Sequence, residues 1–480
     1  MKSAHRANVL GSQRGLAIAK LLIVVAVIAV AAIWYLNNEG GELKQQAMIQ
    51  AASIAGSVAE DMLDRADSER ANQLHKVPIS VEKINDFIFQ ARGIGNTHVI
   101  TTSAGHVMFD TGLALQAARQ LQELQKVLPE GEITHIITSH SHADHIGGVK
   151  FWQKPDTEII AHHDFLEEQR YLKDLEPYFW SRNRLLFPFM PEQPPEAGMF
   201  AYGGVTPTIT VQDWEVYRFE QGGVIFEVYG TPGAEGADNI VLWLPQHKIL
   251  FSGDTFGPMF PQFPNVFTMR GEKVRKPVEY IRSLDLMIAL QPEVIVPSHF
   301  SPVVGLENTV GGMQRMREAV DSVHAQVVAG MNAGKTLYQL MEEVRLPAGS
   351  ELTQGHGKVS WAVKSIWEYY ATWFHFESTT ELYPVPTRAV YADVAVLAGV
   401  EALIQQAQNY RQQGSCVKAL HVLEMALAAE PQRAAALSEQ QSCLQELLQE
   451  ALVLNNTYEV MWLEKQIELT TSALGFASGG

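Results

Sequence analysis

Three histidines and an aspartate within six residues constrain this chain more than any other feature. They stand in the stretch THIITSHSHADHIGG as His140, His142, Asp144 and His145. The apolar, β-rich run before them predicts a strand that ends in a loop. In such a loop His140 and His142 alternate onto one side and can share one ion, while Asp144 and His145 turn toward a neighbouring ion. Imidazole combined with carboxylate favours zinc over magnesium or calcium. The alternative is a group of surface histidines that binds no metal.

The overall composition narrows the classes of partner and cofactor. The chain has 480 residues and a net charge of −17, which works against a nucleic-acid partner because phosphate binding needs a basic face. Its only cysteines are Cys416 and Cys443, too few for a cysteine-rich zinc module. Any metal must therefore be held by histidines and carboxylates. We expect the two cysteines on neighbouring helices, where a disulfide and two free buried thiols both remain open.

An apolar run near the N-terminus predicts attachment to a membrane. Residues 21–36 read LLIVVAVIAVAAIWYL, and with the residues before them the run reaches the roughly 20 residues that span a bilayer. Four basic residues that precede the run place that end in the cytoplasm. We therefore expect a single-pass protein of the plasma (inner) membrane with its catalytic domain on the periplasmic or outer side. A cleaved secretory signal ending near Ala31 and a buried core helix are the alternatives. The basic residues are Lys2, Arg6, Arg14 and Lys20.

Changes in hydrophobic period divide the chain into four segments. Residues 1–39 form the predicted cytoplasmic tip and transmembrane anchor, and residues 40–78 are a helical pattern that could serve as a stalk. Residues 79–309 alternate short β-rich runs with helical stretches, which predicts an α/β catalytic domain of two sheets with helices packed outside. Residues 310–480 are helical by period and predict a separate domain of stacked antiparallel helices.

Three further motifs follow the histidine cluster in order, and each contains a side chain of a type that can bind a metal. They are TPGAEGADNIVLWLP, FSGDT and VPSHFSP, with Glu235, Asp254 and His299. Together with HSHADH, this series resembles the metallo-β-lactamase superfamily, whose fold is an αβ/βα sandwich. The resemblance implies that Asp254 bridges two Zn²⁺ ions and that Asp110, in MFDTG, supports the metal loop. The implied ligand set is His140, His142, Asp144, His145, Glu235, Asp254 and His299.

One position directs the resemblance to a particular branch. Glu235 stands where most members of the superfamily have a histidine, and the alkyl sulfatase branch also has glutamate there. The likeness to that branch covers about residues 80–475, through NVFTMRGEKVRKPVEYI, GMNAGKTLYQLMEEVRLP, GKVSWAVKSIWEYYATWF and LYPVP. It implies a homodimer formed by the helical domain, and we expect the branch's C-terminal sterol-carrier-like domain to be absent. Pro264 departs from the branch, which has there a histidine thought to assist the leaving group.

Binding of an anionic ester requires further cations near the metals. Two Zn²⁺ ions, three carboxylates and one hydroxide sum to no net charge, so the metals alone would hold a sulfate monoester weakly. The run RGEKVRK supplies Arg270 and Arg275. Without the resemblance this run is equally well a solvated face. With it, we expect both arginines and Asn265 to bind the substrate, because arginine forks fit pairs of sulfate oxygens. Arg275→Ala should then raise KM and leave zinc content intact.

Two other groups stand outside the predicted site. His162 and His163 follow a strand-like run and are best interpreted as an ordinary strand-end pair. Aromatic residues crowd two loop-like segments, about residues 178–190 and 256–263. These loops either cover a core or line an apolar pocket, which an alkyl chain would fit.

The sequence thus predicts an enzyme that uses two zinc ions. We expect a hydrolase that cleaves alkyl sulfate esters, small anionic amphiphiles, to alcohol and sulfate with metal-activated water. Its predicted catalytic residues are Asp144, Asp254, Arg270 and Arg275. One alternative is a metallo-hydrolase of another ester or amide, such as a lactam, a lactone or a phosphoester. A non-catalytic, membrane-tethered scaffold is the other. Chain-length preference and the choice between C–O and S–O cleavage stay open.

Overall fold

The computed structural model describes residues 41–63, 77–187, 204–257 and 261–478. The predicted cytoplasmic tip and transmembrane anchor lie outside these residues. Within the described ranges, no helix combines the length and the apolar character that a membrane crossing requires.

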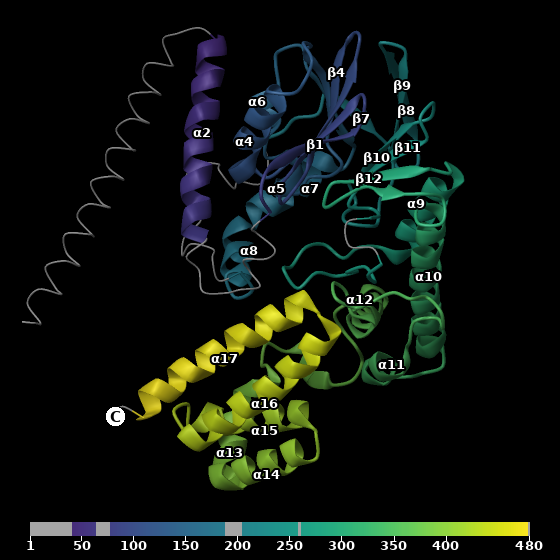
Figure 1. Cartoon of the computed structure of the whole chain (residues 1–480). Helices are drawn as coiled ribbons and strands as arrows, with labels where there is room; N and C mark the ends of the chain where they lie inside the picture. The colour runs from purple at the N-terminus through teal and green to yellow at the C-terminus, as the bar shows by residue number, and fades with distance from the viewer. Residues whose placement is uncertain (1–40, 64–76, 188–203, 258–260, 479–480) are drawn as a thin grey trace, which may run out of the picture.

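Two β-sheets form the upper part of the molecule in Figure 1, above the helices of the C-terminal part. The first has the strand order β1-β2-β3-β4-β5-β6-β7, and the second has the order β13-β12-β11-β10-β9-β8. Strands β4 to β7 run parallel, as do β11 and β12, and the other neighbours are antiparallel. The first sheet consists of β1 Ser80–Asn85, β2 Ile88–Arg92, β3 Thr97–Thr102, β4 Gly105–Thr111, β5 Ile133–Ile137, β6 Glu158–His162 and β7 Ile209–Val211. The second consists of β8 Val216–Gln221, β9 Val224–Gly230, β10 Ile240–Leu244, β11 Ile249–Gly253, β12 Val294–Pro297 and β13 Val303–Val304.

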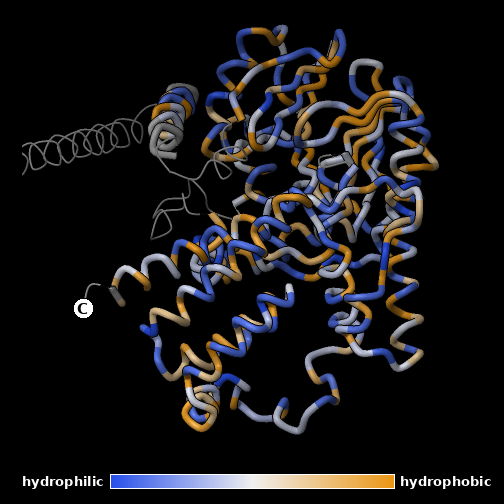
Figure 2. Tube along the Cα trace, turned by 60° about the horizontal axis from the view of Figure 1, so that its bottom comes forward, coloured by the Kyte–Doolittle hydropathy of each residue, from blue (hydrophilic) through white to orange (hydrophobic). Residues whose placement is uncertain are grey.

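Alternating side chains explain why the two sheets pack face to face with helices outside. In β4, Phe109 joins the core between the sheets, while the preceding Met108 joins the core under the outer helices. In β10, Leu242 points inward and Trp243 outward. The central residues of both strands are apolar on both faces, and Figure 2 shows strongly hydrophobic strands within the sandwich. This arrangement confirms the predicted αβ/βα sandwich.

Helices cover both outer faces. The first sheet is covered by α4 Ala114–Gln125, α5 Ala143–Ile146 and α6 Val149–Trp152, and the second by α9 Pro277–Ala289 and α10 Val310–Asn332. Two short helices, α7 Phe165–Asp174 and α8 Glu176–Asn183, follow β6.

The segment interpreted as a stalk is helical, as expected, but it lies against the first domain. Helix α2 spans Gly41–Leu63, and its Ile49 is buried in the same core as α4. Gln45 Nε2 donates to the carbonyl oxygen of Phe151 at 2.7 Å, and Ser53 Oγ donates to Gln122 Oε1 at 3.0 Å. Because one face of α2 packs on α4 and α6, the helix forms part of the outer layer (Figure 1).

The boundary predicted at residues 309/310 falls inside a shared core. Met313 of α10 and Val363 of α12 join Ile295 of the second sheet in one apolar cluster, to which α11 also contributes. The helices with cores of their own come later, in α14 to α17. The elements after α10 are α11 Leu337–Glu343, α12 Val359–Ala371, η1 Thr379–Leu382, η2 Thr387–Val390, α13 Tyr391–Ala398, α14 Val400–Gln412, α15 Cys416–Ala429, α16 Ala434–Leu454 and α17 Thr457–Ser478.

The two cysteines are free thiols. Cys416 in α15 and Cys443 in α16 are both buried, on neighbouring helices as expected. The Cys416 thiol donates to Glu446 Oε2 at 3.1 Å. Of the two alternatives that the sequence leaves open, the structure therefore has the unbridged one.

Candidate metal centre

The predicted ligands lie on segments that follow the carboxyl ends of strands. The histidine loop follows β5, Glu235 follows β9, Asp254 follows β11 and His299 follows β12. Main-chain hydrogen bonds tie these segments together: Ile240 N donates to Ser139 O at 2.8 Å, and Ser298 N donates to Gly253 O at 3.1 Å. The two sheets therefore deliver residues from four parts of the chain to one end of the sandwich.

All seven predicted metal ligands converge there. Their ligand atoms form three overlapping groups, in each of which the atoms lie within 4.8 Å of one another. The first group is His140, His142 and Glu235, the second is His140, His145 and Asp254, and the third is Asp144, His145 and His299.

At one end of the centre, two imidazoles face each other and a glutamate. His140 Nε2 lies 2.8 Å from His142 Nδ1, and that Nδ1 lies 3.7 Å from Glu235 Oε1. Burial, together with the charges of His145 and His142, lowers the pKa of His140 well below its usual value. A neutral His140 with an available ring nitrogen is the form that binds a metal.

At the other end, two imidazoles face two carboxylates. His145 Nε2 lies 3.4 Å from Asp254 Oδ2 and 3.7 Å from Asp144 Oδ2. His299 Nε2 lies 3.2 Å from Asp254 Oδ2 and 3.4 Å from Asp144 Oδ2. Nδ1 of His299 donates to the carbonyl oxygen of Ile94, which leaves Nε2 directed at the carboxylates.

Asp110 holds the second end in place from behind. Its Oδ1 accepts from Ser139 N at 2.7 Å, and its Oδ2 accepts from Ser139 Oγ at 2.7 Å, from Ser298 Oγ and from His145 Nδ1, which lies at 2.8 Å. The residue is fully buried and has a φ of +53°. Because His145 donates from Nδ1, its Nε2 is left as the ligand atom. This geometry agrees with the supporting role that the resemblance implies.

The donor set fits a divalent cation. His145 Nε2 and Asp254 Oδ1 are buried and have no hydrogen-bond partner among the described residues. Burial raises the pKa of Asp254, but His299 and His145 outweigh it and hold that pKa well below its usual range. Burial lowers the pKa of His299, but Asp254 and Asp144 raise it to about 10. The centre therefore attracts positive charge, which a cation bound to imidazole and carboxylate would supply.

The two predicted anion-binding arginines are paired with carboxylates. Arg275 donates from Nη1 to the carbonyl oxygen of Asn265 at 2.9 Å and from Nη2 to Glu235 Oε1 at 2.5 Å. Arg270 Nη2 lies 3.1 Å from Glu272 Oε1 and 3.7 Å from Glu235 Oε1. The side chain of Arg275 is only 5% exposed, against 27% for Arg270. Arg275 thus contacts a predicted metal ligand, and Arg270 is the more accessible of the two.

Two acidic residues of the site escaped the sequence analysis. Glu272 lies between the arginines, 3.3 Å from Arg275 Nη2, and its Oε2 lies 3.5 Å from His142 Nε2. Asp238 accepts from Ser141 N at 2.8 Å and so braces the histidine loop. The sequence did contain a signal for Glu272, because an acidic residue stands there inside a basic run that is expected to bind an anion. The neighbouring Lys273 pairs with Glu168 at 2.8 Å, away from the ligands.

The remaining groups behave as ordinary structure. His162, His163 and Asp164 cluster closely enough to hold an ion, but Asp164 N donates to His162 Nδ1 at 3.2 Å. The proton of His162 is then on Nε2, which lies 2.9 Å from Asp213 Oδ1 but makes no hydrogen bond with the described residues. Of the aromatic loops, Phe256 and Phe263 are buried in the core of the second sheet.

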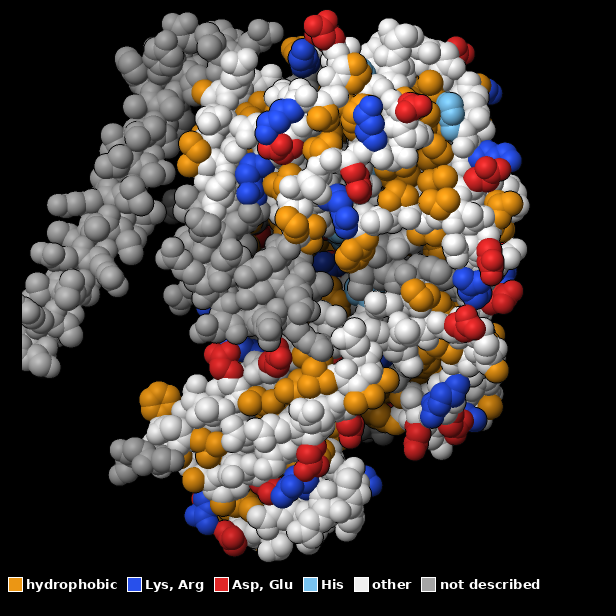
Figure 3. Space-filling view, in the orientation of Figure 1, with side chains coloured by type: hydrophobic (Ala, Val, Ile, Leu, Met, Phe, Trp, Pro, Cys, Tyr) orange, Lys and Arg blue, Asp and Glu red, His pale blue; other side chains and the backbone are white. Residues whose placement is uncertain are grey.

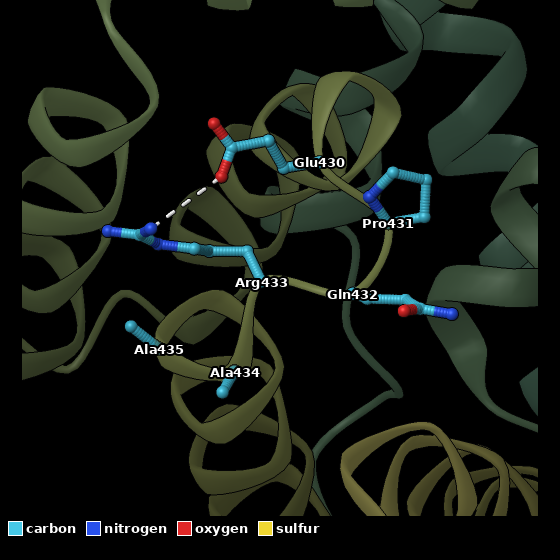
Figure 4. A pocket seen from close by; sticks show the side chains of 6 residues that line it. All are labelled: Glu430, Pro431, Gln432, Arg433, Ala434 and Ala435. Carbon is cyan, nitrogen blue, oxygen red and sulfur yellow. Dashed lines mark ion pairs between the residues drawn. The ribbon is translucent and has the colours of Figure 1, made fainter. Parts of the chain in front are cut away.

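A hollow at the turn between α15 and α16 holds none of the predicted site residues. Figure 4 shows Arg433 and Glu430 facing each other across it. Arg433 Nη1 lies 3.8 Å from Glu430 Oε2. Its lining is Glu430, Pro431, Gln432, Arg433, Ala434 and Ala435.

Two family models match separate parts of the chain. Residues 91–299 match the metallo-beta-lactamase superfamily, and residues 336–468 match the family described as alkyl sulfatase dimerisation. The first match contains all seven predicted ligands. The second begins within the helices that pack on the second sheet and continues through the bundle.

Curated relatives carry sulfatase names. A linear primary-alkylsulfatase from Pseudomonas sp. is 30% identical over 310 residues, which are 60% of this chain and 58% of the relative. The alkyl/aryl-sulfatase BDS1 from Saccharomyces cerevisiae is 25% identical over 378 residues, 73% of this chain and 58% of the relative. The chain therefore spans less than two thirds of the length of these relatives.

A solved structure shares the fold. The stereoselective inverting sec-alkylsulfatase Pisa1 from Pseudomonas sp. superposes with a TM-score of 0.69 at 19% identity, covering 89% of this chain and 78% of that chain. The likeness extends through both the sandwich and the helical part.

Proposed function

Because this chain joins a metallo-beta-lactamase superfamily domain to an alkyl sulfatase dimerisation domain, we propose that it is a zinc-dependent hydrolase of alkyl sulfate esters. The observation that carries the proposal is the convergence of three histidines and Asp144 with Glu235, Asp254 and His299. The sulfatase names of the relatives at 23–30% identity support the choice of ester.

The side chains divide into two ligand sets around a shared aspartate. His140, His142 and Glu235 would hold one zinc ion, and Asp254, whose ligand atom groups with those of His140 and His145, would be a ligand common to both sets. Asp144, His145 and His299, whose ligand atoms lie together, would hold a second ion. Bound zinc would supply Lewis acidity and a water molecule that ionises near neutral pH.

The arginine end of the site is assigned to the sulfate group. Arg270 is the cation with the greater exposure, so its guanidinium can leave Glu272 to meet the ester's anionic oxygens. Arg275 stays on Glu235 and the Asn265 carbonyl, where it orients a ligand carboxylate. A site whose metal charge is balanced by its ligands needs Arg270 to attract an anion.

We further propose that the chain acts as a homodimer through its helical part. Between α12 and α14, apolar side chains are left on the surface: Trp373 is 71% exposed, Phe376 87% and Leu397 88%. Figure 3 also shows apolar side chains along α17. Exposed apolar surface of this extent is typical of an interface, and the family name of residues 336–468 points to a second copy. Analytical ultracentrifugation tests this: a monomer at micromolar concentration would contradict it.

Turnover of a substrate panel tests the activity. The zinc-loaded protein should hydrolyse octyl and dodecyl sulfate faster than nitrocefin, an acyl lactone or a phosphodiester. Chelation should abolish the activity and added zinc should restore it. Asp254→Asn should lose activity, whereas Asp156→Asn, at an exposed turn, should not. Preferred turnover of another ester or of the lactam would replace the sulfatase proposal, and purified protein without metal or activity would favour the scaffold.

A further inference from the structure

The segment 353–357, which precedes α12, packs directly on the loop that carries Asn265. Phe263 N donates to Thr353 O at 2.8 Å, and Gly357 N donates to Phe263 O at 3.2 Å. A side chain on Gly357 would place its Cβ 2.2 Å from the carbonyl oxygen of Pro264, so only glycine permits this approach. The segment is thereby held at the edge of the metal centre.

Residues at the start of α17 form hydrogen bonds with the same segment from the other side. Thr457 N donates to Gly355 O at 3.0 Å, and Asn456 Nδ2 donates to Gln354 O at 2.7 Å. These bonds bring His356 beside Tyr458, with ring centroids 5.5 Å apart. Two residues a hundred positions apart in the sequence thus meet next to the loop of the arginines.

Both rings lie within range of the charges of the site. Burial and then the charges of Arg275 and Arg270 lower the pKa of His356 to about 3, and Asp254 and His299 act on it as well. Burial raises the pKa of Tyr458, on which Arg270 and Glu235 also act. At neutral pH both rings are therefore uncharged hydrogen-bond donors.

These donors are available to a ligand. Both side chains are half-buried, and their contact with each other is between rings and involves no hydrogen bond among the described residues. Nδ2 of Asn265, on the adjoining loop, is buried and likewise has no acceptor among the residues described. Unpaired donors within range of the charge of Arg270 are an arrangement that an oxyanion would satisfy.

We propose that His356 and Tyr458 are substrate-contacting residues, which donate hydrogen bonds to the oxygens of the sulfate ester beside Arg270. The inference rests on the proposed function and deepens it, because it makes the helical part of the chain one wall of the hydrolytic site. The sandwich domain would then supply the metal ligands and the arginines, and the helical part would supply two neutral donors.

Binding and turnover of the full-length, zinc-loaded protein test the proposal. The probe for binding is 1-octanesulfonate, which carries the anionic head and the chain but no ester bond, measured by isothermal titration calorimetry. Tyr458→Phe removes only the hydroxyl, and His356→Gln keeps a donor of different reach. We expect about 10- to 100-fold weaker sulfonate binding and lower kcat/KM for octyl sulfate, with zinc content unchanged. The matched controls are Tyr338→Phe and His421→Gln, both at exposed positions, which should behave as wild type.

The outcomes separate this inference from the proposed function. If the wild type cleaves sulfate esters and both variants match it in binding and turnover, the inference is wrong and the function stands. If the wild type binds the sulfonate but cleaves no sulfate ester, and the variants bind it less tightly, the function is wrong and the anion-binding role stands. Loss of zinc from Tyr458→Phe would show a structural role and would overturn the inference.

Discussion

The two ends of the metal centre are held by different kinds of contact. His145 and His299 are oriented by hydrogen bonds to Asp110 and to a main-chain carbonyl, all on segments tied into the sheets. Glu235 is oriented by ion pairs to Arg275, whose loop also meets the helical part of the chain. The first end is therefore built by the sandwich alone, whereas the second depends on charged side chains that the substrate also approaches. We therefore expect a substitution at the first end to change metal binding without changing substrate binding. A substitution at the second end should change both.

Removing the support at the sheet-held end should have the largest effect. Asp110→Asn keeps a residue that tolerates positive φ but loses the charge that holds His145 and two serines. We expect zinc affinity to fall about 10- to 100-fold. Breaking this buried network should also cost about 3–5 kcal/mol of unfolding free energy. Zinc titration and urea denaturation measure the two effects. Asp156→Asn is the control, and wild-type values for Asp110→Asn would contradict the assigned support.

Removing a metal ligand at the arginine end should lower the zinc content by one ion per chain. Glu235→Gln keeps the volume of the side chain but removes the carboxylate that faces His142. We expect zinc to fall from two ions per chain to about one, because a neutral amide is a poor zinc ligand. Native mass spectrometry would count the ions. Glu279→Gln on α9 serves as the comparison, and loss of both ions at once would show that the two ends are not independent.

The two arginines should differ when each becomes lysine. Arg275→Lys should lose zinc from the Glu235 end as well as raise KM, since an ammonium cannot hold both Glu235 and the Asn265 carbonyl. Arg270→Lys should raise KM for octyl sulfate about 10-fold and leave the zinc content intact. This amends the expectation from sequence that zinc would survive loss of the Arg275 fork. Equal zinc contents in both variants would instead support the expectation that zinc binding does not depend on Arg275.

The smallest expected effect is a pH dependence at Asp238. Burial raises the pKa of this carboxyl to about 7 from its usual 3.8, with Glu168 adding to the shift. The folded protein therefore binds a proton that the unfolded chain releases, so between these values the unfolding free energy falls as pH rises, by about 1 kcal/mol per pH unit. Asp238→Asn removes this dependence. Urea denaturation of the zinc-free protein measures the unfolding free energy at pH 5 and 6.5. From pH 5 to 6.5 the unfolding free energy of the variant should rise relative to that of the wild type. An equal change in both proteins would contradict the raised pKa.

Much of the fold and half of the site follow from local pattern. The spacing of His140, His142, Asp144 and His145 is a property of one loop, and the strand before it is apolar on both faces because each face meets a layer. Glu235, Asp254 and His299 were predicted by resemblance, since no spacing links them to the loop. The structure adds that α2 packs on the sandwich and that one core extends across residue 310. Periodicity marks the apolar stripe of α2 or α10 but does not state which surface the stripe will cover.

By itself, the sequence determined the class of the fold, the kind of ligand offered to a metal and the presence of cations near it. Only the tertiary structure decided that Arg275 is paired with Glu235, that Glu272 faces His142, and that His356 lies beside Tyr458. The physical reason is distance along the chain. Residue type and periodicity act within a few positions and decide strands, helices and loops. The partners of a buried charge are chosen where segments from separate parts of the chain pack together, and nothing in their local sequence records that choice.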